Sequence, residues 1–453
     1  MQPLPKEFEE QMKRLLGEAG FFAYLDALNQ PYTRALRVNL LLRPDGTPPC
    51  PIEGLGAPVP WARGAYFVEG DARPGLSPLH EGGLFYMQEP SALTAVTALD
   101  PQPGERVLDL CAAPGGKSTQ IAALMAGRGL LCCNEPIPSR AQILSRNIER
   151  MGVLNAVVLS AMPNALAPRF PAFFDRILVD APCSGEGMFR RQPEARDEWD
   201  ADAPRRCADR QMEILAQAAK MLRPGGTMVY STCTFNDTEN EGVLRRFLAL
   251  HPEFSLVPFA LPGLPEAKDG YLHLYPHEMR GEGHFVSRLK KADGADEADA
   301  PVQAAPQRKA PARAAAKGKA PAPIALPTVF SDAFAPERLY TAGDALWMLP
   351  EGISIERLSG LRVLRTGLLL AHAEGKRSEP DHALAMALRP EEAARTASLT
   401  QTQALAYQAG ETLSLGDLPG GYTLLCCEGV SLGWGKQAGG LMKNHYPKGL
   451  RRR

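Results

Sequence analysis

The chain carries almost no surplus charge of either sign and has no long uncharged apolar stretch. Its 453 residues include 50 Lys and Arg against 51 Asp and Glu, which gives a formal net charge of −1. This balance excludes a strong overall attraction to nucleic acid, so any such binding must come from local basic patches. The N-terminus, MQPLPKEFEEQMKRLL, is amphipathic and acidic and lacks the apolar centre of a signal peptide. We therefore expect a cytoplasmic protein that contains no membrane-spanning segment.

Cysteine is present, but its spacing does not suit cross-linking or metal binding. The nine cysteines are scattered, with adjacent pairs at 132–133 and 426–427, and no C-x-x-C spacing occurs. The pattern predicts neither a zinc site nor a disulfide framework, and we expect no bound metal. Hydrophobic residues make up 45% and charged residues 22%, as in globular proteins, and the length is enough for two or three domains.

Two common nucleotide-binding signatures are missing from the most informative stretch, residues 104–118 (GERVLDLCAAPGGKS). The dinucleotide pattern G-x-G-x-x-G does not occur, and a P-loop would need glycine where Cys111 stands. The stretch instead has a short apolar run at 107–110, a Pro-Gly-Gly turn at 114–116 and a helical pattern at 119–125. A strand, a glycine turn and a helix N-terminus expose free backbone N–H groups at the carboxyl end of the strand. This arrangement predicts a small-molecule cofactor site.

Strands and helices alternate after this stretch, which predicts an α/β fold with a doubly wound sheet. Further strands are expected at 129–133, 156–159, 175–180 and 227–231, with closing strands at 254–257 and 284–290. Helices are expected at 140–151, 205–222 and 240–250. Before the cofactor stretch, residues 6–28 predict one or two helices, and 84–91 predict a strand that leads into a helix near 91–99.

Several motifs together resemble the Nop2/Sun (Fmu) family of RNA cytosine-5 methyltransferases. They are LDLCAAPGGKSTQIA (108–122), DAPCSGEGMFR (180–190), STCT (231–234) and RVN (37–39), while the ending at 429–453 resembles the PUA-like domain of the family's bacterial ribosomal-RNA branch. The resemblance implies a Rossmann-like methyltransferase sheet with an N-terminal α+β extension and a C-terminal α+β region that ends in an RNA-binding domain. The expected divisions are an extension at 1–100, a methyltransferase domain at 101–291, a disordered Ala- and Pro-rich linker at 292–328 and a C-terminal region at 329–453.

The family resemblance implies a covalent reaction that uses cysteine. Ring carbon C5 of cytosine is a poor nucleophile until a thiolate adds to the neighbouring C6. Two predicted loops each offer a thiol, Cys183 after the fourth strand and Cys233 after the fifth, and spacing alone does not say which one attacks. DNA cytosine-5 methyltransferases use the Cys of a Pro-Cys pair, whereas the RNA family uses the Thr-Cys residue. The resemblance therefore implies Cys233 as nucleophile, Cys183 in product release and Asp180 against the N3/N4 edge of the base.

The same resemblance implies S-adenosyl-L-methionine as the methyl donor. Its methionine end is expected against Cys111, Ala112, Ala113, Pro114, Gly115, Gly116 and Lys117, with Asp180 nearby. Glu135, at the end of the second strand, is expected to accept the ribose hydroxyls, and Arg140 to support it. Many family members carry an Asp after the third strand for the adenine, but residues 160–164 (SAMPN) contain no acid. How adenine is bound is therefore left open.

RNA, most simply ribosomal RNA, is the expected partner of a monomeric enzyme. Candidate RNA contacts are Arg34, Arg37, Lys436, Lys443, His445 and Lys448, because basic and aromatic side chains together suit RNA. For the two arginines, a solvated strand edge is an equally good interpretation. Two other functions are kept as alternatives: a transfer-RNA cytosine-5 methyltransferase, and a non-catalytic RNA-binding or ribosome-assembly factor.

Overall fold

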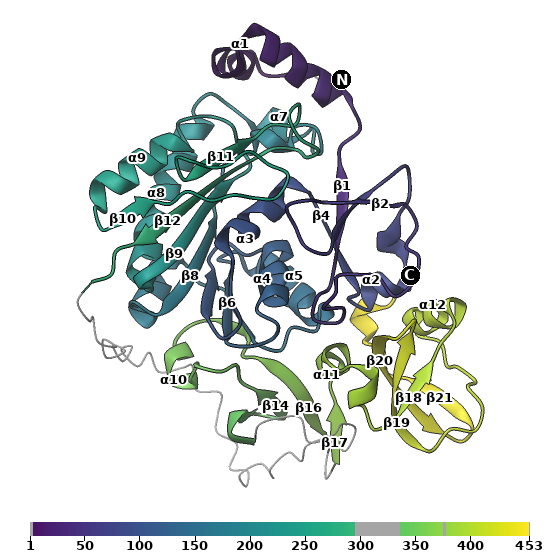
Figure 1. Cartoon of the computed structure of the whole chain (residues 1–453). Coiled ribbons are helices and arrows are strands. Elements are labelled where there is room, and N and C mark those ends of the chain that lie inside the picture. The colour runs from purple at the N-terminus through teal and green to yellow at the C-terminus, as the bar shows by residue number, and fades with distance from the viewer. Residues whose placement is uncertain (1–2, 295–335, 375–376, 453) are drawn as a thin grey trace.

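The computed structural model describes residues 3–294, 336–374 and 377–452. The linker expected at 292–328 therefore lies outside the described residues from position 295 onward. Figure 1 shows a large central sheet with helices on both faces, a smaller N-terminal sheet beside it, and two small sheets from the C-terminal part of the chain. No helix among the described residues combines the length and the apolarity that crossing a membrane requires.

The central sheet has nine strands, eight of them in the order β10-β12-β9-β8-β5-β6-β7-β15, while β11 pairs with β12. The strands are β5 (Arg106–Asp109), β6 (Leu130–Asn134), β7 (Ala156–Leu159), β8 (Phe174–Asp180), β9 (Leu222–Thr232), β10 (Phe254–Leu256), β11 (Tyr271–Leu274), β12 (His284–Lys291) and β15 (Val363–Arg365). Strands β9, β8, β5, β6 and β7 pair in parallel, and the remaining pairings are antiparallel. The chain builds outward from β5 to β7 and then resumes on the other side of β5 with β8. Ligands bind at such a switch point, beyond the carboxyl ends of the strands.

Helices cover both faces of this sheet, which confirms the predicted doubly wound fold. One face carries α3 (Thr94–Leu99), α4 (Gly116–Leu124) and α5 (Pro138–Arg150), and the other carries α8 (Ala203–Met221) and α9 (Glu241–Leu250). In α5 the buried residues Ala141, Leu144 and Ile148 recur at helical spacing, so one stripe of the helix packs on the sheet and the rest faces outward. The chain also forms the single-turn helices α6 (Pro163–Leu166) and α7 (Ala195–Glu198).

One predicted boundary is wrong. The turn at 223–226, expected to separate the long helix from the fifth strand, is part of β9, which begins at Leu222. The pairing of β9 with β8 is irregular between Phe174 and Arg176, and this irregularity accommodates the turn residues within the strand.

The N-terminal region combines a broken helix with a four-stranded antiparallel sheet. Helix α1 (Lys6–Asn29) bends at Gly17, whose φ of 68° lies outside the helical range, so the region predicted to form one or two helices has two helical segments. The sheet has the order β2-β3-β1-β4, from β1 (Arg34–Val38), β2 (Leu55–Pro58), β3 (Ala65–Val68) and β4 (Phe85–Gln88), and α2 (Pro78–Glu81) precedes β4. Figure 1 places β1 and β4 beside the helices α3 and α4 of the central domain.

The C-terminal region forms two further four-stranded sheets. The first has the order β13-β14-β16-β17, from β13 (Leu339–Ala342), β14 (Ala345–Met348), β16 (Leu368–Glu374) and β17 (Arg377–Pro380). The second has the order β18-β19-β20-β21, from β18 (Thr396–Ser398), β19 (Gly421–Cys427), β20 (Val430–Ala438) and β21 (Leu441–Asn444). The associated helices are α10 (Ile355–Leu358), α11 (His382–Ala387) and α12 (Gln401–Ala409).

The C-terminal region is joined to the rest of the molecule through its packing. Strand β15 pairs with β7 at the edge of the central sheet, and Leu358 of α10 is buried in the core below that sheet. Tyr407 and Leu432 of the last domain share a second core with Leu36 and Phe85 of the N-terminal sheet. Residues after 329 therefore complete two cores that earlier parts of the chain begin.

Candidate active site

The glycine turn between β5 and α4 is shaped by close neighbours. Gly115 has a φ of 113°, which residues with a side chain rarely adopt, and a Cβ placed there would lie 3.2 Å from Leu144. A Cβ on Gly116 would lie 3.2 Å from the ring of Tyr86 in β4. The turn therefore packs closely between α5 and the N-terminal sheet, and a side chain at either position would press on its neighbour.

Arg37 holds this turn from below and cannot meet RNA, which corrects one of the predicted RNA contacts. Its side chain is 1% exposed. Its guanidinium donates to the hydroxyl of Thr119 at 2.8 Å and to the carbonyl of Gly116 at 3.3 Å, both in α4. Burial lowers the pKa of Arg37 to about 10, so the group remains charged at neutral pH. The motif residue thus joins the N-terminal sheet to the first turn of α4.

A cavity of about 780 Å³ opens beyond the carboxyl ends of β5, β6 and β8. Glu135, at the end of β6, lines it with a carboxylate that is 3% exposed. One Glu135 oxygen accepts the Ile137 N–H at 2.9 Å, and the other lies 3.3 Å from the Arg140 guanidinium. These two contacts fix the orientation of the carboxylate, which suits a group that accepts hydrogen bonds from two adjacent hydroxyls.

The same cavity has an apolar wall where the sequence offered no acid. Ile137 and Met162 both line it, and they are 49% and 60% exposed, which is unusual for side chains of this size. Pro163 and Asn164 line the cavity next to Met162. A flat aromatic ring fits between such side chains without a charged partner, so the missing acid after β7 does not argue against an adenine-containing ligand.

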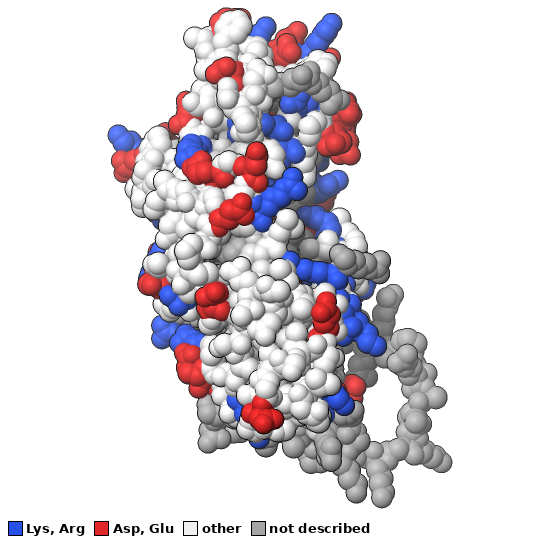
Figure 2. Space-filling view, turned by 90° about the vertical axis from the view of Figure 1, so that its right-hand side faces the viewer, with Lys and Arg blue, Asp and Glu red and all other residues white. Residues whose placement is uncertain are grey.

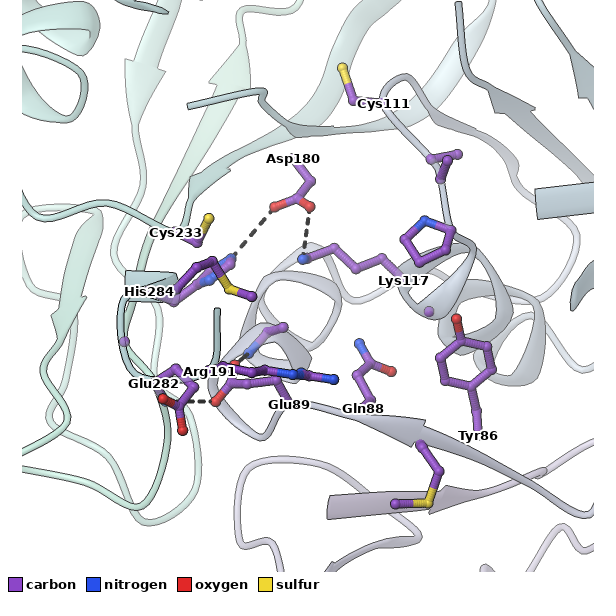
Figure 3. Close-up of a pocket in the computed structure, with 18 of the residues that line it drawn as sticks. Tyr86, Gln88, Glu89, Cys111, Lys117, Asp180, Arg191, Cys233, Glu282 and His284 are labelled. Atoms are coloured by element: carbon purple, nitrogen blue, oxygen red, sulfur yellow. Dashed lines mark hydrogen bonds and ion pairs between the residues drawn. The ribbon is translucent and has the colours of Figure 1, made fainter. Parts of the chain in front are cut away.

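A second cavity, of about 250 Å³, is lined by Gly116 and Lys117 of the first turn of α4 and by residues of β4, β8 and β12 (Figure 3). The two cavities share five lining residues: Cys111, Ala113, Asp180, Ala181 and Cys233. Of the predicted cofactor-loop residues, Ala112, Pro114, Gly116 and Lys117 line only the smaller cavity, and Gly115 lines neither. The two cavities therefore adjoin, and Asp180 and Cys233 are the polar and thiol side chains that border both.

Asp180 lies at this junction with three polar neighbours. Lys117 Nζ is 2.8 Å from one carboxylate oxygen, while the other accepts the Ser231 hydroxyl at 2.8 Å and lies 3.5 Å from His284 Nε2 (Figure 3). Burial alone would raise the pKa of Asp180, but the charge of Lys117 and the contact with His284 hold it well below its usual range. Burial likewise opposes the charge on Lys117, and the attraction of Asp180 overcomes it and raises the Lys117 pKa. The site thus keeps an ionised carboxylate beside an ammonium.

The two thiols of the predicted pair are in contact. Cys183 Sγ lies 3.3 Å from Cys233 Sγ, so one thiol can donate a hydrogen bond to the other sulfur. The interaction with Cys233, followed by burial, raises the pKa of Cys183 well above its ordinary value. The raised pKa favours the neutral thiol form of Cys183 in this contact.

A buried polar network joins the two cysteine-bearing loops. The hydroxyl of Ser184, next to Cys183, lies 2.8 Å from that of Thr234, next to Cys233. Below them, Glu239 accepts hydrogen bonds from the Ser184 N–H at 3.0 Å, Asn236 at 2.8 Å and Gln211 at 2.8 Å. Because every member of this set has a partner, the loops are fixed relative to each other, and the short separation of the thiols follows from that.

Several residues of the smaller cavity were not predicted. His284 begins β12, and Glu89, Arg191 and Glu282 also line the cavity (Figure 3). Glu282 is paired with Arg190 through two contacts of 2.7 Å, and its backbone N–H donates to Glu89 at 2.8 Å. The family resemblance implies that residues 84–91 help to hold the substrate, so the element that carries Glu89 was expected near the site, although Glu89 itself was not singled out. His284 and Glu282 had no such signal, because β12 and the turn before it are far from the cysteines in sequence.

The predicted RNA contacts of the last domain divide into two places. Lys436 and Lys443 are cross-strand neighbours in β20 and β21, and Lys436 lies over the ring of Tyr422. His445 packs against the same ring and lies 2.9 Å from Glu379. Lys448 is exposed and lies outside this group, in the last turn of the chain.

Other basic residues are engaged within the protein. Arg452, close to the C-terminus, donates to the backbone carbonyls of Leu76 and Ser77. Arg34 donates to carbonyls of Gly70 and Ala72, so its contact with RNA stays a prediction. Figure 2 shows acidic and basic side chains interspersed over the described part of the face that includes the C-terminal domain, as the near-zero net charge predicts.

Four family models match the chain in succession. They are described as the N-terminal domain of 16S rRNA methyltransferase RsmF (residues 4–90), 16S rRNA methyltransferase RsmB/F (96–290), RsmF rRNA methyltransferase first C-terminal domain (328–388) and methyltransferase RsmF PUA domain (394–452).

Curated relatives and solved structures point in the same direction. The protein called Ribosomal RNA small subunit methyltransferase F of Erwinia tasmaniensis is 34% identical, over 98% of this chain and 96% of its own. The protein of the same name from an Enterobacter species is 35% identical, over 98% and 95%. A methyltransferase homolog protein from Pyrococcus horikoshii is 30% identical over 63% of this chain and 95% of its own, with a TM-score of 0.54. NSun6 from Pyrococcus horikoshii with SFG, 22% identical over 64% of this chain and 99% of its own, has a TM-score of 0.55 and shares the fold.

Proposed function

The chain belongs to the RsmB/F family of 16S rRNA methyltransferases, and from that premise we propose that it methylates C5 of a cytosine in small-subunit ribosomal RNA through a covalent adduct on Cys233. The observation that carries the proposal is the contact between two thiols, 3.3 Å apart, at the junction of two cavities beside an ionised carboxylate. Methylation at this ring carbon needs an attacking thiolate, polar groups for the base edge and a methyl donor, and a second thiol next to the first can assist release of the product.

The larger cavity suits an S-adenosylmethionine-type cofactor. Glu135 would hold the ribose with Arg140 beside it, Ile137 and Met162 would enclose the adenine, and Cys111 and Ala113 would face the methionine end. When bound, such a cofactor supplies an electrophilic methyl group. No group of His, Cys, Asp and Glu in the described ranges is arranged to hold a metal ion.

The smaller cavity suits the target cytosine. The ionised Asp180 carboxylate can accept the N4 amino hydrogen, and the Lys117 ammonium beside it can donate to the N3 side of the ring. This assigns Lys117 to the base rather than to the cofactor, in keeping with the cavity that it lines. Tyr86 and Gln88 of β4, with Met188, form other walls of the same cavity.

The Cys233 thiolate adds to C6 of the base and forms a carbon–sulfur bond, which leaves the electron pair on C5. That electron pair would form the bond to the methyl group as the bond between the methyl group and the donor sulfur breaks, leaving the donor as a neutral thioether. A base then removes the C5 proton, and the electron pair of the C–H bond restores the C5–C6 double bond and expels the Cys233 thiolate. The raised pKa of Cys183 keeps it neutral beside Cys233, so its S–H can donate to the attacking sulfur and later to the departing one.

The experiment that tests this proposal separates the two thiols. The full chain and its Cys233→Ala and Cys183→Ala variants are incubated with small-subunit ribosomal RNA and cofactor. We expect 5-methylcytosine at a discrete site with the unmodified chain, detected by bisulfite sequencing, and neither product nor adduct with Cys233→Ala. In the Cys183→Ala variant, Cys233 can still attack the base, but the adduct should break down slowly. Protein covalently bound to RNA should therefore accumulate and be visible on a denaturing gel.

The opposite distribution of adducts would assign the attack to the Pro-Cys thiol. Full activity in both variants without any adduct would reject covalent catalysis. Absence of methylated ribosomal RNA with the unmodified chain, alongside methylated transfer RNA, would move the substrate assignment to transfer RNA.

A further inference from the structure

A third cavity, of about 260 Å³, lies where the N-terminal region, α5 and the end of the chain meet. Its walls include Ile143 and Arg146 of α5, His80 of α2, His382 of α11, and Tyr446 and Leu450 near the C-terminus. Pockets for drug-sized ligands measure about 300–1,000 Å³, so this cavity suits a single small ring system.

Two ring-bearing side chains, Tyr446 and His382, form part of the cavity wall. Tyr446 is buried, and its ring stands at 86° to that of His382, with the ring centres 5.4 Å apart. His382 Nδ1 is buried without a hydrogen-bond partner among the described residues. A heterocycle placed here would find an aromatic surface beside an imidazole whose polar atom is still available.

The charges around the cavity balance each other. Arg146, Glu149 and Arg150 of α5 and Glu81 of α2 all line it, so two positive and two negative groups border the same space, with Glu149 also paired to Arg365. A phosphate would meet both carboxylates, whereas a neutral base, with donors and acceptors on its edge, can use both signs. Arg146 is exposed and forms no ion pair within the described part of the chain, and it could meet the sugar–phosphate backbone at the rim.

Only one layer of side chains separates this cavity from the one assigned to the target cytosine. Arg150 lines the third cavity, and its guanidinium lies over the ring of Tyr86, which lines the target cavity. Likewise Asn147 of the third cavity donates at 2.9 Å to the carbonyl of Pro114, which lines the target cavity. A short length of one RNA strand could therefore occupy both.

We propose that the third cavity binds an unpaired base of the RNA substrate that lies close in sequence to the target cytosine. The proposal rests on the function inferred above. It gives the junction of three regions a role in recognition, because the base would touch α2, α5 and the last turn of the chain at once.

The test uses the full chain and a transcribed segment of small-subunit ribosomal RNA around the cytosine mapped by bisulfite sequencing. A set of RNAs carries one abasic nucleotide at each flanking position in turn, and binding is measured by fluorescence anisotropy. With the unmodified chain we expect one flanking abasic position to weaken binding about tenfold, as loss of a stacked base does.

Two variants fill the cavity from different walls, Ile143→Trp and Leu450→Trp, so the result does not depend on one of them folding. Each should bind the unmodified RNA about tenfold more weakly and lose the penalty at that abasic position, while melting temperature and cofactor affinity stay unchanged. The matched control is Arg128→Trp, because Arg128 is exposed and precedes β6 at the opposite end of the sheet.

An abasic penalty that is the same in the unmodified chain and in both variants, or no penalty at any flanking position, would overturn the proposal. Methyl transfer by the unmodified chain to the mapped cytosine is measured with the same RNA. If this methyl transfer is absent, the proposed function is rejected. If it occurs but the two variants do not remove the abasic penalty, only the base-binding role of the third cavity is rejected.

Discussion

In the proposed mechanism, Asp180 accepts a hydrogen bond from the base and Lys117 donates one to it. Because the pKa of Asp180 is held below its usual range, the carboxylate carries no proton to donate at neutral pH. Any donor to the N3 side of the base must then be another group, and the Lys117 ammonium, 2.8 Å from Asp180, is the one in place. The pair is also neutral overall, so it can remain buried before the substrate arrives.

Cofactor affinity should depend on Glu135. Charge-assisted hydrogen bonds contribute about 1.5–3 kcal/mol each, so Glu135→Ala should weaken S-adenosylmethionine binding by at least about tenfold. Calorimetry on the full chain measures the affinity. Glu135→Gln keeps the size and an oxygen that can accept the Ile137 N–H, and it should lose less. Unchanged affinity in a folded Glu135→Ala chain would reject the ribose assignment.

Asp109 should make stability depend on pH. Burial raises its pKa to about 7, against a partial opposing effect of the Ser118 hydroxyl, which donates to it at 2.6 Å. Below about pH 4 the carboxyl is protonated in both the folded and the unfolded chain and costs nothing. Between there and pH 7 the folded state binds the proton more tightly, so stability falls as pH rises, and the full cost remains above pH 7.

Asp109→Asn removes that titration while retaining an oxygen for Ser118. The melting temperature of the variant relative to the unmodified chain should therefore rise by a few degrees between pH 5 and pH 8. Differential scanning calorimetry at the two pH values measures it, with Asp417→Asn, at an exposed position, as the baseline. A difference that stays flat with pH would show that Asp109 is not the titrating group.

At the scale of single residues, the motifs predicted which side chains gather but not what each one touches. Cys183, Cys233 and Asp180 do meet, because the carboxyl ends of parallel strands share one edge of the sheet. The prediction that Arg37 is accessible to RNA or solvent was wrong, because the sequence of a short strand does not indicate that a helix packs over its arginine. His284 was missed because it reaches the site through the antiparallel pairing of β12 with β9, which the local sequence does not encode.

Strands β20 and β21 place two like charges opposite each other. Lys436 and Lys443 are cross-strand neighbours, an arrangement that costs free energy unless an anion lies nearby. If they bind phosphates, changing both to Gln should weaken RNA binding and reduce the slope of log affinity against log salt by about 0.7–0.9 for each phosphate that is no longer neutralised.

Anisotropy titrations at several salt concentrations measure this slope. Changing the exposed Lys6 and Lys268 to Gln removes the same charge from other parts of the chain and serves as the control. An equal loss of slope in both double variants would mean that only the total charge matters and that the β20–β21 pair is no binding element.

Elements with a strong periodic pattern were predicted best, and those that depend on distant partners were predicted worst. The parallel strands and α5 followed from apolar runs and helical spacing. Strand β15 could be expected as an extended segment, yet nothing in its three residues indicates that it pairs with β7, more than 200 positions earlier.

On the scale of the whole molecule, the C-terminal region supports the fold of the catalytic part. Ending the chain at residue 291 would remove β15 from the edge of β7, uncover the core around Leu358, and expose the apolar side of the N-terminal sheet that packs on Tyr407 and Leu432. Loss of RNA affinity in such a truncated chain would therefore not identify an RNA-binding domain.

The truncated chain should be less stable than the full chain because it loses packing contacts. This effect can be separated from the loss of the covalent link between the two parts. A protease site inserted within residues 296–325 allows the chain to be cut while both pieces remain present. Because the packing of β15, Leu358 and the shared core persists in the cut protein, it should keep the melting temperature and the cofactor affinity of the intact chain. The chain that ends at 291 should melt at least several degrees lower and bind cofactor more weakly, since the edge of β7 and two cores are open. Equal melting temperatures for the truncated and the full chain would show instead that the catalytic sheet is complete without β15.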